Sequence, residues 1–174
     1  MSIVDQKKWY AIYTNPRAEK KVTQLLSNKG FEVYLPLQTT LKQWSDRKKK
    51  VEEPLFKSYL FVNIAFEKEH VDVLSTLGVV KFIKIGKDLS PIRPEIIRAI
   101  QLSLQYFDEL QTSSEHFQLH QQVEVIAGPL QGYKGIITEQ HGNRYFAIQI
   151  EQLGTHLLLK VPAQHLSPLS IQIS

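Results

Sequence analysis

The sequence predicts an α+β protein with two domains: an amino-terminal domain of split βαβ order with an antiparallel sheet, and a small all-β barrel. Along the first 110 residues, apolar side chains alternate between strand spacing and helix spacing. The polar residues that begin at Gln111 break both periodicities. Short alternating segments then return without a helix between them. We therefore expect domains at 1–110 and 121–174, joined by a flexible linker at 111–120.

The first strand is expected at 9–14, which is apolar and rich in aromatic residues. Asn15 has a side chain suited to cap a helix, and Pro16 suits the first helical position because its missing N–H would be unpaired there anyway. Apolar residues follow at helical spacing from Ala18, and Gly30 is expected to end this helix in a left-handed conformation.

Strands are expected at 31–37, 58–64 and 79–85, with a second helix at 67–77 that carries Val71, Leu74 and Leu77 on one face. The resulting order of strand, helix, strand, strand, helix, strand is that of ferredoxin-like domains. Pro94 begins a third helix, whose apolar stripe is expected to pack on the sheet. That stripe consists of Ile96, Ile97, Ile100, Leu104 and Phe107.

The second domain contains four short apolar segments, which are VEVIA, GIITE, YFAIQI and HLLLKVP. Strands this short, separated by glycine-rich or polar turns, predict a small SH3-like barrel. Three glycines, Gly128, Gly132 and Gly135, lie in the first connection. We expect them to supply positive φ angles and room for close backbone approach.

Positive charge is concentrated near the amino terminus. Residues 1–60 contain 12 Lys and Arg against 6 Asp and Glu, whereas the remainder contains 9 against 11. The densest run is Arg47 to Lys50, with Lys42 just upstream, in a segment expected to be a loop or an irregular hairpin. This run has two interpretations: a solvated surface loop, or a set of phosphate contacts to nucleic acid.

Several classes of function lack their sequence signals. The chain has no cysteine, which excludes disulfides and thiolate metal sites. It shows neither a signal peptide nor a stretch of about 20 apolar residues, so we expect a cytoplasmic protein outside the membrane. Motifs for nucleotide hydrolysis, zinc proteolysis and nucleophilic catalysis are absent. His116 and His120 have metal-ligand spacing but lie in the expected linker, so we expect no enzyme, no metal and no cofactor.

The segment KSYLFVNI, at 57–64, matches part of the strand signature of RNA-recognition modules. The matches are Lys57, Tyr59, Phe61 and Val62, and the mismatches are Ser58, Leu60 and Ile64. The aromatic rings of this strand would therefore either stack on nucleotide bases or contact another protein.

Two segments carry a resemblance to a known family. The stretch VEVIAGPLQGYKGIITEQHGNRYFAIQI resembles a KOW motif. Residues 9–13 (WYAIY) and 54–62 (PLFKSYLFV) resemble the amino-terminal domain of NusG-type transcription elongation factors, called the NGN domain. The two resemblances occur in the family's order and together cover nearly the whole chain.

This resemblance implies a regulator of transcription elongation. In the family, an aromatic pocket binds the clamp helices of the largest subunit of RNA polymerase; the corresponding residues here are Phe56 and Tyr59, with Tyr13 and Phe61 as neighbours. The implied effect is suppression of pausing and termination, that is, processive antitermination. The KOW domain would recruit a small-subunit ribosomal protein or a termination factor, and we expect the factor itself to be a monomer.

Some residues depart from the common family pattern. Lys57 and Ser58 replace a Pro-Gly pair, so the turn that enters the strand is expected to differ. Segments 14–21 and 43–50 resemble operon-targeted paralogues, in which this domain also contacts DNA of the transcription bubble. The implied nucleic-acid contacts are Lys42, Trp44, Arg47, Lys48, Lys49 and Lys50. Trp44 would either stack on a base or cover the core, and an RNA-binding module that uses the sheet face is the alternative function.

Overall fold

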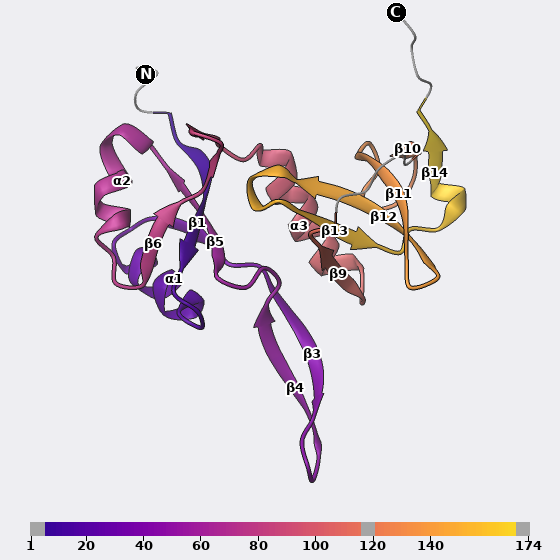
Figure 1. The fold of residues 1–174 in the computed structure, drawn as a ribbon, viewed down its shortest axis with the longest axis horizontal. Coiled ribbons are helices and arrows are strands. Elements are labelled where there is room, and N and C mark those ends of the chain that lie inside the picture. The colour runs from indigo at the N-terminus through magenta and orange to yellow at the C-terminus, as the bar shows by residue number, and fades with distance from the viewer. Residues whose placement is uncertain (1–5, 116–120, 170–174) are drawn as a thin grey trace, which may run out of the picture. The chain divides into compact units, whose positions relative to one another are not determined.

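The computed structural model describes residues 6–115 and 121–169. The chain divides into two compact units, Met1–Pro94 and Glu95–Ser174 (Figure 1). The division falls earlier than the expected domain boundary at 110, because helix α3 (Pro94–Tyr106) groups with the second unit rather than the first. Each unit has its own antiparallel sheet.

The first unit has the predicted ferredoxin-like order. Its elements are β1 (Lys8–Thr14), α1 (Glu19–Asn28), β2 (Glu32–Tyr34), β3 (Leu37–Gln43), β4 (Lys48–Pro54), β5 (Tyr59–Ile64), α2 (Phe66–Leu74), β6 (Val79–Phe82), β7 (Lys84–Ile85) and β8 (Asp88–Leu89). The main sheet has the order β2-β5-β1-β6, and every pair in it is antiparallel. Strands β3 and β4 form a separate two-stranded ribbon, as do β7 and β8.

Alternation along β1 and β5 divides the main sheet into two different faces. On one face, Tyr10 and Ile12 of β1 join Leu60, Val62 and Ile64 of β5 in a closed core. Apolar residues of both helices complete this core, namely Val22, Leu26 and Val73. The opposite face carries the other residues of each strand, and it contains the candidate site described below.

Helix α1 begins three residues later than predicted. Arg17 has a φ of +64°, which is incompatible with a right-handed helix, and the helix therefore begins at Glu19 with Ala18 as its cap residue. The expected Asn15 cap is wrong, although the Asn15 carbonyl still accepts a hydrogen bond from the Ala18 N–H at 3.1 Å. The prediction for Gly30 is confirmed, since its φ is +90° just after the helix.

Helix α2 turns its predicted stripe toward solvent. Val71 and Leu74 do lie on one side of the helix, but they are 62% and 42% exposed. The helix ends at Leu74, before the predicted end at Leu77, and Leu77 is 74% exposed. The residues that pack against the sheet core are buried Val73 and half-buried Phe66. Two apolar spacings overlap in this segment, and the sequence pattern alone does not distinguish the one that faces the sheet.

The basic segment is a regular hairpin rather than a loop. Strands β3 and β4 pair without interruption from Leu37 opposite Pro54 to Gln43 opposite Lys48. The Trp44 N–H donates to the Arg47 carbonyl at 2.8 Å and closes a two-residue turn. In Figure 1 this ribbon extends well away from the main sheet of its own unit.

The second unit contains α3 and a six-stranded antiparallel sheet in the order β14-β10-β11-β12-β13-β9. Its strands are β9 (Leu110–Ser113), β10 (Gln122–Val125), β11 (Lys134–Gln140), β12 (Asn143–Ile150), β13 (Thr155–Leu159) and β14 (Leu166–Pro168). Short 3-10 helices occupy Glu151–Leu153 and Ala163–His165. The protein is therefore α+β, with a ferredoxin-like unit followed by a KOW-like β unit.

Strand β9 corrects the expected linker. Residues 111–113 are polar, yet they pair with β13, where Leu110 lies opposite Leu159 and Ser113 lies opposite His156. Backbone hydrogen bonding at a sheet edge does not require apolar side chains, so the loss of periodicity at Gln111 does not mark a linker. Residues 114 and 115 of the expected linker are exposed and belong to no strand or helix, and residues 116–120 lie outside the described residues.

The glycines of the β unit have the conformations predicted for them. Gly128 and Gly132 have φ values of +84° and +91°. Gly135 allows close approach instead, because a Cβ atom there would lie 2.6 Å from a ring carbon of Phe146. Two distinct physical requirements therefore explain this glycine pattern.

Membrane spans and metal clusters are both absent from residues 6–115 and 121–169. No helix within these ranges combines the length and apolar character needed to cross a membrane. The same ranges contain no group of three or more His, Asp or Glu side chains placed to hold a metal ion. His116 and His120 lie outside the described residues.

Candidate functional site

The face of the main sheet opposite α1 and α2 carries a row of aromatic side chains, which we call the aromatic row. Its members are Tyr13, Tyr34, Phe56, Tyr59 and Phe61. Tyr13 lies directly opposite Tyr59 in the pairing of β1 with β5, and Tyr34 lies opposite Phe61 in the pairing of β2 with β5. Residues paired in this way point to the same face, so two strands on either side of β5 bring these rings together.

The row contains an accessible part and a buried part. The Tyr13 and Tyr59 rings contact each other edge to face, with centroids 5.4 Å apart and planes at 61°, and both residues are half-buried. Phe61 is fully buried, and its ring lies 6.2 Å from that of Tyr34 and 6.2 Å from that of Phe56. The two partly exposed tyrosines therefore lie on the same sheet face as a buried cluster centred on Phe61.

The structure distinguishes among the predicted polymerase contacts. Tyr13 and Tyr59 expose part of their rings, as a docking surface requires. Phe56 is only 5% exposed and its ring packs edge to face on Phe61, so it presents almost no surface to solvent. Phe61, at 0% exposure, has no free face on which a nucleotide base could stack.

Tyr34 belongs to the row, although the sequence does not single it out. Its place beside Glu32 and Val33 suggests only a strand with one polar side. The pairing of β2 with β5 puts it against Phe61, with the two rings stacked at 24°. Burial raises the pKa of the Tyr34 hydroxyl to about 12, so this residue stays neutral under ordinary conditions.

The turn that enters β5 has a left-handed residue. The Tyr59 N–H donates to the Phe56 carbonyl at 3.2 Å, so Lys57 and Ser58 are the central residues, and Ser58 has a φ of +67°. A positive φ at the second central position is the geometry for which a Pro-Gly pair is suited. Ser58 therefore puts a residue with a side chain into the left-handed position of this turn.

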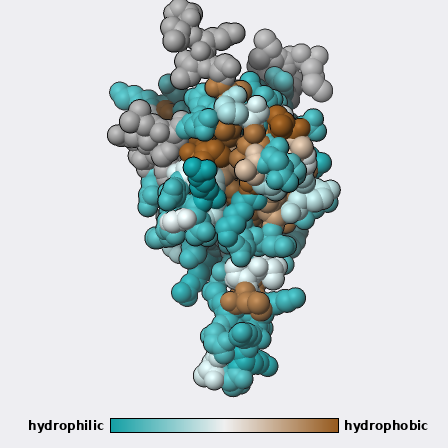
Figure 2. Space-filling view, turned by 90° about the vertical axis from the view of Figure 1, so that its right-hand side faces the viewer, coloured by the Kyte–Doolittle hydropathy of each residue, from teal (hydrophilic) through white to brown (hydrophobic). Residues whose placement is uncertain are grey.

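The hairpin of β3 and β4 presents the predicted basic residues to solvent, all of them exposed, and Figure 2 shows its surface as mainly hydrophilic. Strand alternation divides these residues between two faces. Trp44, Arg47 and Lys49 line one shallow hollow at the tip together with Asp46. Lys48 and Lys50 belong to the other face, where Lys50 lies opposite Leu41.

Trp44 and Lys42 differ in how free their side chains are to contact nucleic acid. Trp44 is 54% exposed, so it does not cover the core, and its ring is accessible for stacking. Lys42 instead forms an ion pair with Glu53 on the same face of the ribbon. The hydrogen bond from Lys42 holds the pKa of the Glu53 carboxyl below its usual value, since the bond favours the ionised acid. A phosphate contact by Lys42 would have to compete with this pair.

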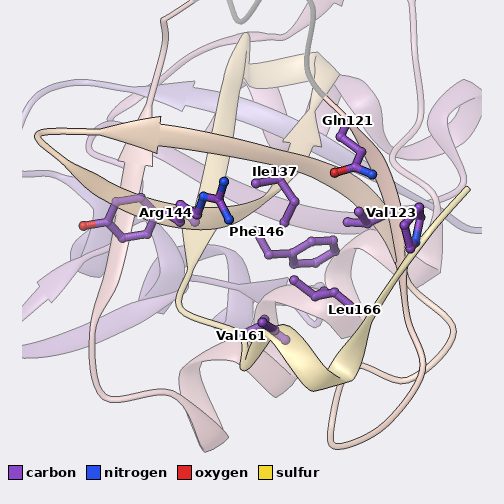
Figure 3. A pocket seen from close by; sticks show the side chains of 10 residues that line it. Gln121, Val123, Ile137, Arg144, Phe146, Val161 and Leu166 are labelled. Carbon is purple, nitrogen blue, oxygen red and sulfur yellow. The ribbon is translucent and has the colours of Figure 1, made fainter.

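The β unit has an apolar hollow of its own, shown in Figure 3. Its lining includes buried Val123 and Phe146 and half-buried Ile137, Val161 and Leu166. Arg144 and Gln121, both exposed, also line it and are labelled in Figure 3. A hollow lined by apolar side chains beside a charged one is suited to hold an apolar side chain of another protein.

Comparisons with known proteins agree with this architecture. The sequence model of the family described as "Transcription termination factor nusG" matches residues 7–101. The "Transcription termination/antitermination protein NusG" of Thermus thermophilus is 27% identical over 154 residues, which is 78% of this chain and 84% of that protein. The protein of the same name from Bacillus subtilis is 29% identical over 147 residues, covering 77% of this chain and 82% of that protein.

A solved structure shows the same fold. The structure titled "Domain interaction in Thermotoga maritima NusG" aligns with a TM-score of 0.57 and 21% sequence identity, and the alignment covers 94% of this chain and 98% of that one. The family match covers more than half of the chain and includes all the strands that carry the aromatic row. This chain belongs to the NusG family of transcription termination and antitermination factors.

Proposed function

We propose that this protein binds the clamp helices of RNA polymerase through the accessible part of the aromatic row and suppresses pausing and termination. The observation that carries the proposal is the pair of half-buried rings, Tyr13 and Tyr59, in edge-to-face contact on the sheet face opposite α1 and α2. Rigid rings give a large contact area with little loss of side-chain entropy, and tyrosine is enriched among the residues that dominate interfaces.

The effect on transcription follows from selective binding. A factor that binds active polymerase tenfold more tightly than the paused conformation shifts the equilibrium between them by about 1.4 kcal/mol. A clamp held closed around nucleic acid is the conformation that such a factor would favour. The protein's own contribution would be a preformed surface, because the Tyr13 and Tyr59 rings already contact each other in the free protein.

We further propose that the β unit recruits a second protein through its apolar hollow. An apolar side chain of the partner would fill the space between Ile137, Val161 and Leu166, and Arg144 beside them would favour a neighbouring carboxylate. Attachment to the first unit raises the effective concentration of that partner at the polymerase. A small-subunit ribosomal protein and a termination factor are the two partners to test.

The hairpin supports a third contact, with DNA of the transcription bubble. Trp44 offers an accessible ring for stacking, and Arg47 and Lys49 beside it offer charges for phosphates. These three side chains lie on one face of the ribbon, so we propose that a single strand of DNA lies along that face. Lys48 and Lys50, on the other face, would attract the strand at longer range without touching it.

The experiment for the main proposal is direct binding of the purified protein to purified RNA polymerase. The variant of choice is Tyr13→Ala with Tyr59→Ala, since Phe56→Ala would remove a buried ring and disturb the fold. Tyr106→Ala is the matched control, because Tyr106 is 57% exposed and belongs to α3. We expect the double variant to lose binding and the control to retain it.

The alternative function, an RNA-binding module, makes the opposite prediction for the same variant. It requires that the double variant bind polymerase normally and lose single-stranded RNA. Burial of Phe61 counts against this alternative, because the signature of RNA-recognition modules uses that position for stacking. Normal polymerase binding by the double variant would overturn the docking proposal.

A further inference from the structure

Ser58 has a backbone conformation that its side chain disfavours. Its φ of +67° lies in the left-handed region, which residues other than glycine populate about 5- to 30-fold less readily than the right-handed region. The residue lies in the turn between Phe56 and Tyr59, two members of the aromatic row. Such a conformation persists only where surrounding contacts hold it in place.

A carboxylate from helix α1 supplies one such contact. The Ser58 N–H donates to Oε1 of Glu19 at 2.8 Å, across a sequence separation of 39 residues. Glu19 is only 5% exposed, which is unusual for a glutamate and agrees with a specific hydrogen-bonding role. A hydrogen bond to an ionised acceptor is roughly twice as strong as one between neutral groups.

The same turn is tied to the strand that carries the other accessible ring. The Thr14 N–H donates to the Ser58 carbonyl at 2.8 Å, directly after Tyr13 in β1. Thr14 is fully buried, so this end of β1 has little freedom to move. The position of Ser58 therefore fixes how the end of β1 lies against the start of β5. This arrangement puts the ring centroids of Tyr13 and Tyr59 5.4 Å apart.

We propose that Glu19 is a positioning residue for the aromatic row: its carboxylate holds the Lys57-Ser58 turn in the left-handed conformation that sets Tyr59 against Tyr13. This inference rests on the proposed function, in which those two rings contact polymerase. Glu19 itself makes no contact with the polymerase in this account. It acts through the Ser58 N–H alone, and a glycine at position 58 would reduce the need for it.

We expect Glu19→Ala to lower the affinity for polymerase, because fewer molecules would hold the turn in the conformation that binds. Glu19→Ala removes the side-chain acceptor and leaves the turn with its backbone hydrogen bonds alone, and we expect the left-handed conformation to fall to roughly one molecule in ten. Apparent affinity for polymerase falls by the same factor, about tenfold. Glu19→Gln keeps an acceptor oxygen of the same reach without the charge, so we expect a smaller loss of about two- to threefold.

A second substitution separates positioning from general stability. Ser58→Gly removes the left-handed penalty, so Glu19→Ala with Ser58→Gly should recover most of the lost affinity. Thr23→Ala is the control, because the Thr23 hydroxyl bonds the Glu19 backbone carbonyl at 2.8 Å in the same helix without touching the turn. We expect Thr23→Ala to bind polymerase like the wild type.

The experiment measures polymerase affinity and the hydrogen-exchange rate of the Ser58 amide in the full chain for all of these variants, with thermal unfolding recorded alongside. The expected result is about a tenfold loss of affinity and faster Ser58 exchange in Glu19→Ala, with recovery of affinity in the Ser58→Gly background. Wild-type affinity in Glu19→Ala would overturn the inference. So would a loss that Thr23→Ala shares and Ser58→Gly does not repair. If the wild type itself does not bind polymerase, the proposed function fails, and unchanged Ser58 exchange in Glu19→Ala would then overturn the positioning role separately.

Discussion

The division of the basic hairpin into two faces gives a quantitative prediction. Two double variants remove the same formal charge from the same ribbon. Arg47→Gln with Lys49→Gln strips the face that carries Trp44, whereas Lys48→Gln with Lys50→Gln strips the opposite face. All four side chains are exposed, so we expect neither variant to change the stability of the fold appreciably.

The expected magnitude follows from counterion release. Each phosphate contact to a single strand contributes about 0.7 to the slope of log affinity against log salt, so loss of two contacts should reduce the slope by about 1.4. Strand alternation allows a single strand to touch only one face of the ribbon. The Arg47 and Lys49 variant should therefore show nearly the full reduction, and the Lys48 and Lys50 variant should show well under half of it.

The assay is fluorescence anisotropy with a labelled single-stranded oligonucleotide over a series of salt concentrations, with circular dichroism melting curves as the check on folding. Equal reductions in the two variants would show that charge alone matters and would refute the one-sided arrangement. An unchanged slope in both would refute nucleic-acid contact by the hairpin. Trp44→Ala tests the stacking contribution, which should lower affinity at every salt concentration without changing the slope.

Three further predictions concern stability. Phe56→Ala should lower the free energy of unfolding by about 3–5 kcal/mol in chemical denaturation, because it removes a buried ring; a loss below about 1 kcal/mol would mean that the ring is not packed. Gly135→Ala should destabilise the β unit, since its Cβ would meet the Phe146 ring, and an unchanged melting temperature would contradict that contact. The raised pKa of Tyr34 means that its neutral form is favoured by folding, so its contribution is present below about pH 10 and is lost as pH rises toward 12. Over this window the wild type should lose on the order of 1 kcal/mol in free energy of unfolding, after allowance for the partial exposure of Tyr34. Tyr34→Phe should not show this loss. Identical pH profiles of the variant and the wild type would count against the prediction.

Much of the fold could be predicted because it rests on periodicity. The apolar runs at 9–14 and 58–64 are visible in the sequence as strands, and they form β1 and β5, the two central strands of the main sheet. The glycines of the β unit were predictable for the same kind of reason, since positive φ and close approach leave few other choices. Local chemistry was sufficient in both cases.

The wrong predictions have a common physical cause. A local sequence pattern does not show which strand or helix a segment will pair with or pack against. Polar residues from Gln111 to Ser113 suggest a linker, but their backbone groups complete the edge of a sheet. The α2 segment contains two overlapping apolar spacings, and only the position of the sheet selects Val73 over Val71. The α1 cap differs because Arg17 adopts a left-handed conformation that no local rule requires.

The sequence indicated which aromatic residues to consider but not which of them are exposed. Tyr13 and Tyr59 are partly exposed, whereas Phe56 is buried and Tyr34 is an additional member of the row. Exposure of an aromatic residue depends on its neighbours across the sheet, and these become known only with the strand register. Glu19 could not have been singled out, because its partner Ser58 is 39 residues away.

Site-specific photo-cross-linking tests the central claim most directly. A photoreactive phenylalanine analogue placed at Tyr59, and separately at Tyr106 as a control, would be irradiated in the presence of purified RNA polymerase. The docking proposal predicts that the probe at position 59 cross-links to the clamp helices of the largest subunit, whereas the probe at position 106 does not. Cross-links from position 59 to nucleic acid or to other subunits alone, or none in a complex that forms normally, would contradict it.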